Sequence, residues 1–186
     1  ILTPSQFGIF GVATLLLTFV EILTETGINI FLVQNKEKVD RYLGTAWIVS
    51  IVRGALIASV IFLSSSFVAS FFKIQNAQSI IALISLVPII RGFINPAIIN
   101  LQKELLFKKE FYLRTAVLAI ETLATILLVW VYGSIEALIY GMLSGALLEV
   151  ALSYLMIKPW PSLKFVPSHF KEIVSKGKWI TGATVL

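Results

Sequence analysis

Residues 44–72 read GTAWIVSIVRGALIASVIFLSSSFVASFF, and this stretch decides the fold of the chain. Arg53 is the only charged residue among its 29 positions. A helix of about 20 mainly apolar residues crosses the hydrocarbon core of a bilayer, whereas a surface helix of a soluble domain is apolar on one face only. The stretch therefore predicts a transmembrane α-helix.

Four further segments are similarly long and apolar, and they predict spans at residues 7–33, 79–101, 111–132 and 135–157. A last apolar run, 175–186, is too short to cross and predicts the start of another span. Hydrophobic residues make up 58% of the chain, charged residues 13%, and the mean hydropathy is +0.92. A soluble fold this apolar lacks the polar groups to cover its surface. We expect an all-α membrane protein with five full transmembrane helices, and a sequence that is a fragment.

The loops between the predicted spans alternate in charge. Loops 34–43, 101–114 and 158–178 hold twelve Lys and Arg residues, whereas loop 72–78 holds one and the turn 132–134 holds none. Short cytoplasmic loops of membrane proteins are enriched in Lys and Arg. The basic loops are therefore predicted in the cytoplasm, and the net charge of +5 reflects topology rather than nucleic-acid binding. Five spans that start outside imply at least one helix upstream if the protein's N-terminus is cytoplasmic.

Residues 159–174 form a long linker before the last apolar run. Pro159, Pro161 and Pro167 exclude a regular helix in its first half. Residues 168–177 are basic and amphipathic, which fits a segment on the membrane surface that acts as a hinge. A plain solvated linker is the alternative.

Five charges lie deep inside the spans, one in each. They are Glu21, Arg53, Arg91, Glu121 and Glu149. A charge at the centre of a membrane helix costs roughly 2.5–3.5 kcal/mol on insertion scales. Counting at about 1.5 Å per residue from the cytoplasmic ends places all five at a depth of roughly 12–18 Å. A shared height predicts a polar, water-accessible cavity between helices. Glu25 and Glu136 lie near span ends and are predicted to be interfacial.

The two arginines are the candidate substrate-binding residues. Arg53 and Arg91 would attract an anionic head group, because a guanidinium fork pairs well with phosphate. Glu21, Glu121 and Glu149 would balance charge or carry a coupling ion. The structural alternative is a set of interhelical ion pairs, such as Arg53–Glu21 or Arg91–Glu121, that only hold the bundle together. For Glu149 the sequence favours the structural role.

Asn95 and Pro96 predict a kink in the third span, because proline frees a backbone carbonyl inside a helix. Kinks are common in transporters that rock between two states, and a static kink is the alternative. Residues 141–145 form a GxxxG pattern, which lets two helices approach closely.

Several classes of function are not supported by the residues present. The chain has no G-x-x-x-x-G-K-[ST] loop for nucleotides, no cysteine, and a single histidine, His169. The expected external loops are only a few residues long. We expect no enzyme activity, no metal, no cofactor and no nucleic-acid partner.

Several short motifs resemble one family of exporters. They are LTPSQFG at 2–8, TGI at 26–28, LVQ at 32–34, RGFINP at 91–96, QKELLFK at 102–108 and GKWI at 177–180. Their order and spacing resemble Wzx-type polysaccharide or lipopolysaccharide flippases (O-antigen, colanic-acid-like). That branch belongs to the superfamily of multidrug, oligosaccharidyl-lipid and polysaccharide exporters.

The resemblance implies two lobes of six helices around a cavity that opens to each side in turn. Residues 1–158 would then be part of the N-terminal lobe, 159–174 the cytoplasmic linker between lobes, and 175–186 the start of the next helix. The implied substrate is an oligosaccharide on undecaprenyl pyrophosphate, flipped across the inner membrane for surface polysaccharide biosynthesis. Implied partners are membrane lipids and other polysaccharide-assembly proteins. A small-molecule or multidrug exporter of the same superfamily, and a structural membrane subunit without transport, remain alternatives.

Overall fold

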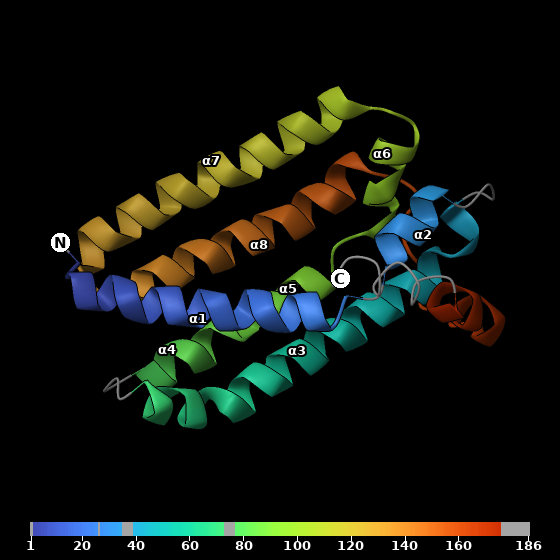
Figure 1. Ribbon diagram of the computed structural model, residues 1–186. Coiled ribbons are helices and arrows are strands. Elements are labelled where there is room, and N and C mark those ends of the chain that lie inside the picture. The colour runs from blue at the N-terminus through green and yellow to red at the C-terminus, as the bar shows by residue number, and fades with distance from the viewer. Residues whose placement is uncertain (1, 26, 35–38, 73–76, 176–186) are drawn as a thin grey trace.

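The computed structural model describes residues 2–25, 27–34, 39–72 and 77–175, and every regular element among them is a helix (Figure 1). Four helices are long: α1 (Pro4–Leu23), α3 (Leu43–Phe71), α7 (Phe107–Tyr132) and α8 (Glu136–Met156). The short helices are α2 (Ile28–Gln34), η1 (Val39–Arg41), α4 (Ala77–Ile84), α5 (Leu86–Gly92), η2 (Pro96–Ile99) and α6 (Asn100–Lys103). Residues 167–175 are also helical. The predicted all-α fold is confirmed.

The four long helices are each long and apolar enough to cross a membrane. The segments 77–92 and 96–103 make a fifth crossing if the bend of 71° between them lies within one span. Helix α7 is the most exposed, and Leu123, Ile126 and Trp130 on it are each more than half exposed. In a bilayer, lipid covers such side chains, so the fold is that of a multi-pass membrane protein. The predicted start of another span lies outside the described residues, apart from Ser175.

The first predicted span, residues 7–33, is divided into two helices. Helix α1 begins with a capping box: the Gln6 backbone N–H donates to the Thr3 hydroxyl, and the Thr3 backbone N–H donates to the Gln6 side chain. It ends at Leu23, and α2 begins after Gly27. Gly27 has a φ of +62°, a left-handed conformation that glycine adopts without the steric cost of a Cβ. The segment predicted as one span is therefore two helices separated by a break at residues 24–27.

The third predicted span is interrupted at Asn95 and Pro96, where the sequence predicts a kink. The Phe93 carbonyl, left without a helical partner, accepts hydrogen bonds from Trp47 Nε1 (3.4 Å) and the Tyr154 hydroxyl (3.0 Å). The Asn95 side chain caps the next turn by accepting from the backbone N–H of Ala97 at 3.0 Å. The polar groups freed by the break are thus satisfied by neighbouring helices, as a membrane interior requires.

The predicted basic loops gather at one end of the bundle. The connections around η1, at residues 104–106 and at residues 157–175 lie together there, at the right of Figure 1. A compact cluster of buried side chains from α2, η1, α6 and the last helix forms a core at this end. A second core, between α1, α3, α4 and α8, fills the other half of the bundle.

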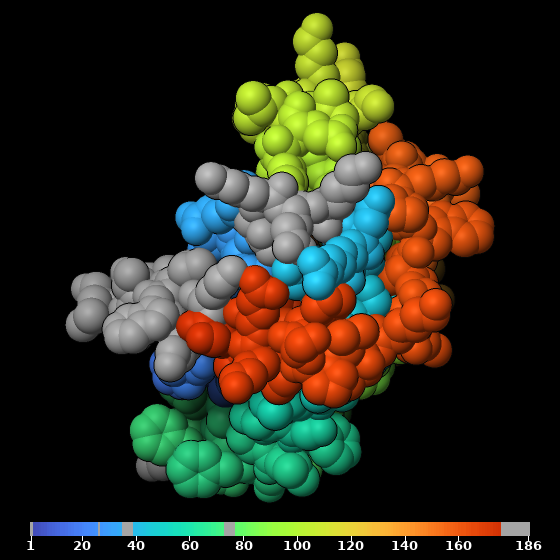
Figure 2. All heavy atoms as spheres, turned by 90° about the vertical axis from the view of Figure 1, so that its right-hand side faces the viewer, coloured from blue at the N-terminus to red at the C-terminus, as the bar shows by residue number. Residues whose placement is uncertain are grey.

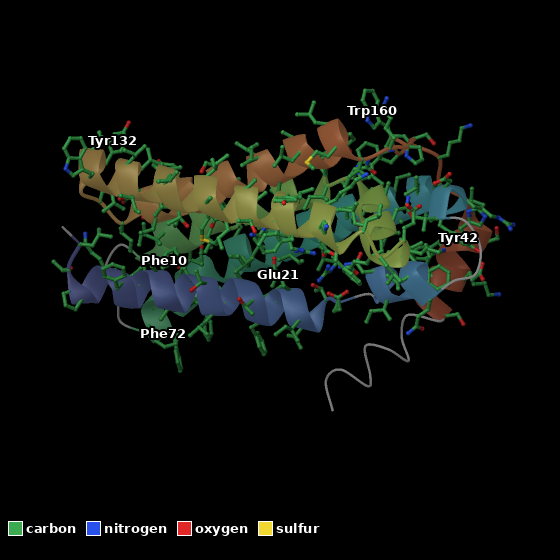
Figure 3. All side chains as sticks on the ribbon, turned by 90° about the horizontal axis from the view of Figure 1, so that it is seen from above. Phe10, Glu21, Tyr42, Phe72, Tyr132 and Trp160 are labelled. Atoms are coloured by element: carbon green, nitrogen blue, oxygen red, sulfur yellow. The ribbon has the colours of Figure 1, made fainter. Side chains whose placement is uncertain are left out.

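The linker packs on this end instead of extending away from it. Residues 167–175 bury Ile173 completely and lie over the start of α3 (Figure 2). The Tyr42 hydroxyl donates to Glu172 Oε2 at 2.9 Å, and the Tyr42 and His169 rings lie 4.8 Å apart. Figure 3 shows Tyr42 at this same end. The amphipathic segment therefore uses Ile173, on its apolar side, to contact protein; residues 176 and 177 lie outside the described part.

Candidate functional site

Two glycines bring α3 and α5 together at the level of the predicted cavity. A Cβ on Gly54 would collide with the carbonyl oxygen of Pro88, and one on Gly92 would lie 3.1 Å from the Ser50 carbonyl oxygen. Only glycine allows backbones to approach this closely. Each glycine directly follows an arginine, Arg53 or Arg91. The close crossing of the two helices therefore lies directly beside both arginines, which line the same cavity.

A cavity of about 570 Å³ lies beside this crossing, between α1, α3, α5 and α8. Four of the five predicted residues line it: Glu21, Arg53, Arg91 and Glu149. Glu21 lies on the side of α1 that faces the other helices (Figure 3). Its charged lining also includes Glu25 from the α1–α2 connection and Arg114 from α7. Four of the charges that were predicted to share a depth thus line a common interior space.

Arg53 is held by two partners. Its Nη2 donates to the backbone carbonyl of Glu21 at 2.8 Å and to Glu25 Oε2 at 3.2 Å. Glu21 lies in the last turn of α1, where carbonyls lack helical partners and the helix dipole attracts a cation. Arg53 therefore ties the end of α1 to α3, and its ion pair is with Glu25 rather than with the Glu21 carboxylate.

Arg91 is bound more loosely. It lies between Glu149 Oε2 at 3.8 Å and Glu21 Oε1 at 4.0 Å, which are ion-pair distances but too long for hydrogen bonds. Its Nε, like that of Arg53, is buried and has no hydrogen-bond partner among the described residues. A buried donor without a hydrogen bond is costly. An anion that entered the cavity could accept a hydrogen bond from this Nε and remove that cost.

Glu121 does not line the cavity. Its carboxylate lies against Gly145 of α8, and Thr125, one turn later, lies against Gly141. The predicted GxxxG pattern is thus the surface on which α7 packs against α8. The Arg91–Glu121 pair considered from the sequence is replaced by Arg91–Glu149, because Glu121 belongs to this helix interface.

Sequence reasoning missed two of the cavity's charges. Glu25 is predicted at the membrane interface, near the end of the first span. The helix breaks after Leu23, however, and Glu25 lies in the cavity against Arg53. Arg114 is expected in a basic loop, but it lies on α7 and pairs with Glu110 at 2.8 Å. The i, i+4 spacing of Glu110 and Arg114 is a helix signal in the sequence that could have placed Arg114 on α7.

These features define a class of protein: a multi-pass helical membrane protein whose spans enclose a charged cavity lined by arginine and glutamate. The chain belongs to the family described as "Polysaccharide biosynthesis protein", whose family model matches residues 1–186. No curated protein and no solved structure matches it. Membership of this family supports a role in polysaccharide biosynthesis.

Proposed function

We propose that the protein is a Wzx-type flippase, which moves an oligosaccharide on undecaprenyl pyrophosphate from the cytoplasmic to the periplasmic leaflet of the inner membrane. The observation that carries the proposal is that Arg53 and Arg91, each next to a glycine of the α3–α5 crossing, line the same cavity. Two guanidinium groups in an apolar protein match the chemistry of a pyrophosphate. Family membership supports the polysaccharide context.

The proposed orientation rests on charge. The described parts of the three basic loops lie at the same end of the bundle, and the positive-inside rule assigns this end to the cytoplasm. The cavity would open to each side in turn while the substrate's lipid tail stays in the bilayer. The chain would contribute binding and a hydrated path for the sugar, with no covalent chemistry, no metal and no cofactor. Membrane lipids and other polysaccharide-assembly proteins are its proposed partners.

The test replaces Arg53 and Arg91 in the full-length protein by Ala and by Lys, in cells that lack the native copy. Surface polysaccharide is quantified, and membrane levels of each variant confirm that it folds. We expect export to fall in the Ala variants, because the anionic head group loses its cationic partner. Loss in the Lys variants as well indicates bidentate recognition. Normal export with folded Ala variants at both positions rejects the pyrophosphate-binding role.

A second candidate is a small-molecule exporter of the same superfamily. The cavity volume of about 570 Å³ favours it, because pockets of roughly 300–1,000 Å³ suit small ligands. The same strains separate the two candidates: a small-molecule exporter leaves surface polysaccharide intact and changes resistance to toxic compounds instead. If the variants change neither the amount of surface polysaccharide nor the resistance to toxic compounds, a structural subunit is the remaining candidate.

A further inference from the structure

The cavity holds more carboxylates than its two central arginines can neutralise. Glu25 pairs with Arg53 at 3.2 Å, while Glu149 and Glu21 lie 3.8 Å and 4.0 Å from Arg91. The third arginine of the lining, Arg114, is paired with Glu110 outside the cavity lining. If all groups are ionised, three carboxylates therefore face these two central arginines among the described residues of the cavity.

An anion cannot simply enter such a site. Carboxylates already lie within ion-pair distance of both guanidinium groups, and they would repel an incoming phosphate. It can bind only if its oxygens replace those carboxylates at the arginines. The exchange is feasible because these ion pairs are partly solvated, with side chains of the paired residues between 20% and 40% exposed.

We infer that Glu25 and Glu149 are resident counter-anions, which a phosphate-bearing ligand must displace from Arg53 and Arg91. This inference rests on the proposed function and adds a specificity role for the two carboxylates. The structure pairs each arginine with a different carboxylate, so two separate ion pairs must be exchanged. A ligand with two linked phosphates replaces both at once, whereas a single phosphate replaces one and leaves the other carboxylate repelling it. The carboxylates therefore select for a pyrophosphate head group.

Glutamine is the informative substitution, because it keeps the shape of glutamate and removes the charge. In Glu25→Gln the side-chain oxygen can still accept from the Gly27 backbone N–H, a contact of 3.3 Å in the structure. Glu149→Gln removes the negative charge that lies 3.8 Å from Arg91. Glu104→Gln is the matched control, because Glu104 is exposed and does not line the cavity.

The full-length protein is purified in detergent, and its binding of inorganic pyrophosphate and inorganic phosphate is measured by titration calorimetry at fixed pH and salt. We expect Glu25→Gln and Glu149→Gln each to bind pyrophosphate about 1.5- to fivefold more tightly, the range for removing a partly exposed competing ion pair. Phosphate affinity should rise by a larger factor, so that the preference for pyrophosphate narrows. Glu104→Gln should match the wild type.

The Arg91→Ala variant separates a failure of the counter-anion role from a failure of the proposed phosphate site. If the wild type binds pyrophosphate and Arg91→Ala weakens it, while folded Gln variants bind no more tightly, the counter-anion role is wrong and the arginine site stands. If Arg91→Ala changes nothing, or no protein binds either anion, the proposed phosphate site fails and the inference fails with it. Should one Gln variant not fold, the other decides the question, because each acts on a different arginine.

Discussion

Asn95 fixes the break in the third span, and its replacement tests how that break is stabilised. The side chain is completely buried and serves two opposite roles. Oδ1 accepts from the Ala97 N–H at 3.0 Å, while Nδ2 donates to the carbonyls of Ile157 and Pro159, both at 3.3 Å. Only an amide presents an acceptor and a donor in this way. The same residue thus caps η2 and joins it to the end of α8.

The expected loss in the free energy of unfolding follows from these two roles of the Asn95 side chain. Asn95→Ala removes the cap, worth about 1 kcal/mol, and the donor bonds, together worth about 1–2 kcal/mol. Asn95→Asp keeps the cap but turns a carboxylate toward the carbonyls, and a buried unpaired charge costs about 3–5 kcal/mol. Stability should therefore fall in the order wild type, Asn95→Ala, Asn95→Asp.

The assay is the thermal unfolding midpoint of the purified full-length protein in detergent, followed by the loss of its monodisperse peak in size-exclusion chromatography. At about 2–4 °C per kcal/mol, Asn95→Ala should lower the midpoint by about 4–12 °C, and Asn95→Asp by more. Asn100→Ala is the control, because the Asn100 side chain makes no hydrogen bond among the described residues. An Asp variant as stable as the Ala variant would refute the proposed donor role.

Two further predictions concern packing at the helix crossing and at the linker. Gly54→Ala should reduce folded protein in membranes and lower the midpoint, because its Cβ meets the Pro88 carbonyl; Gly8→Ala, where nothing lies within 4 Å, should be neutral or stabilising. Equal behaviour of the two glycine variants would contradict the close crossing of α3 and α5. Tyr42→Phe should lower stability by about 1–2 kcal/mol through loss of the hydrogen bond to Glu172, and protease should cut residues 158–175 faster in the variant. An unchanged cleavage rate would show that this bond does not hold the linker.

Four of the five charges that the sequence grouped together line one cavity, but the sequence does not show which way each charge faces. Counting along a helix of fixed rise predicts a shared depth for Glu21, Arg53, Arg91 and Glu149. The direction of a side chain depends on which face of the helix meets a neighbour, and membrane helices that are apolar all round do not reveal it. Glu121 is predicted at the same depth, but it faces the α7–α8 contact.

Backbone breaks set a second limit on prediction. The apolar pattern of residues 7–33 continues through the connection between α1 and α2, so it signals one span. Helix α1 nevertheless ends at Leu23, and Gly27, directly before α2, has a left-handed backbone conformation that hydropathy does not record. Glu25 reaches the cavity only because of this break. A sequence signal for the crossing did exist: Arg-Gly occurs at both 53–54 and 91–92, and a small residue beside a buried charge indicates where two helices approach.

The two arginines differ in a way that composition and spacing cannot show. Arg53 caps the end of α1 and pairs with Glu25, so much of its binding capacity is used to hold α1 against α3. Among the described residues, Arg91 has only two carboxylates near it, at 3.8 Å and 4.0 Å, which are too far away for hydrogen bonds. Replacing Arg53 therefore removes a contact at the end of α1 together with a cation of the cavity. Replacing Arg91 removes a cation of the cavity but leaves the α3–α5 crossing at Gly92 in place. Of the two, Arg91 is the residue whose loss reports on ligand binding, and Arg53 is the residue through which ligand binding would reach α1.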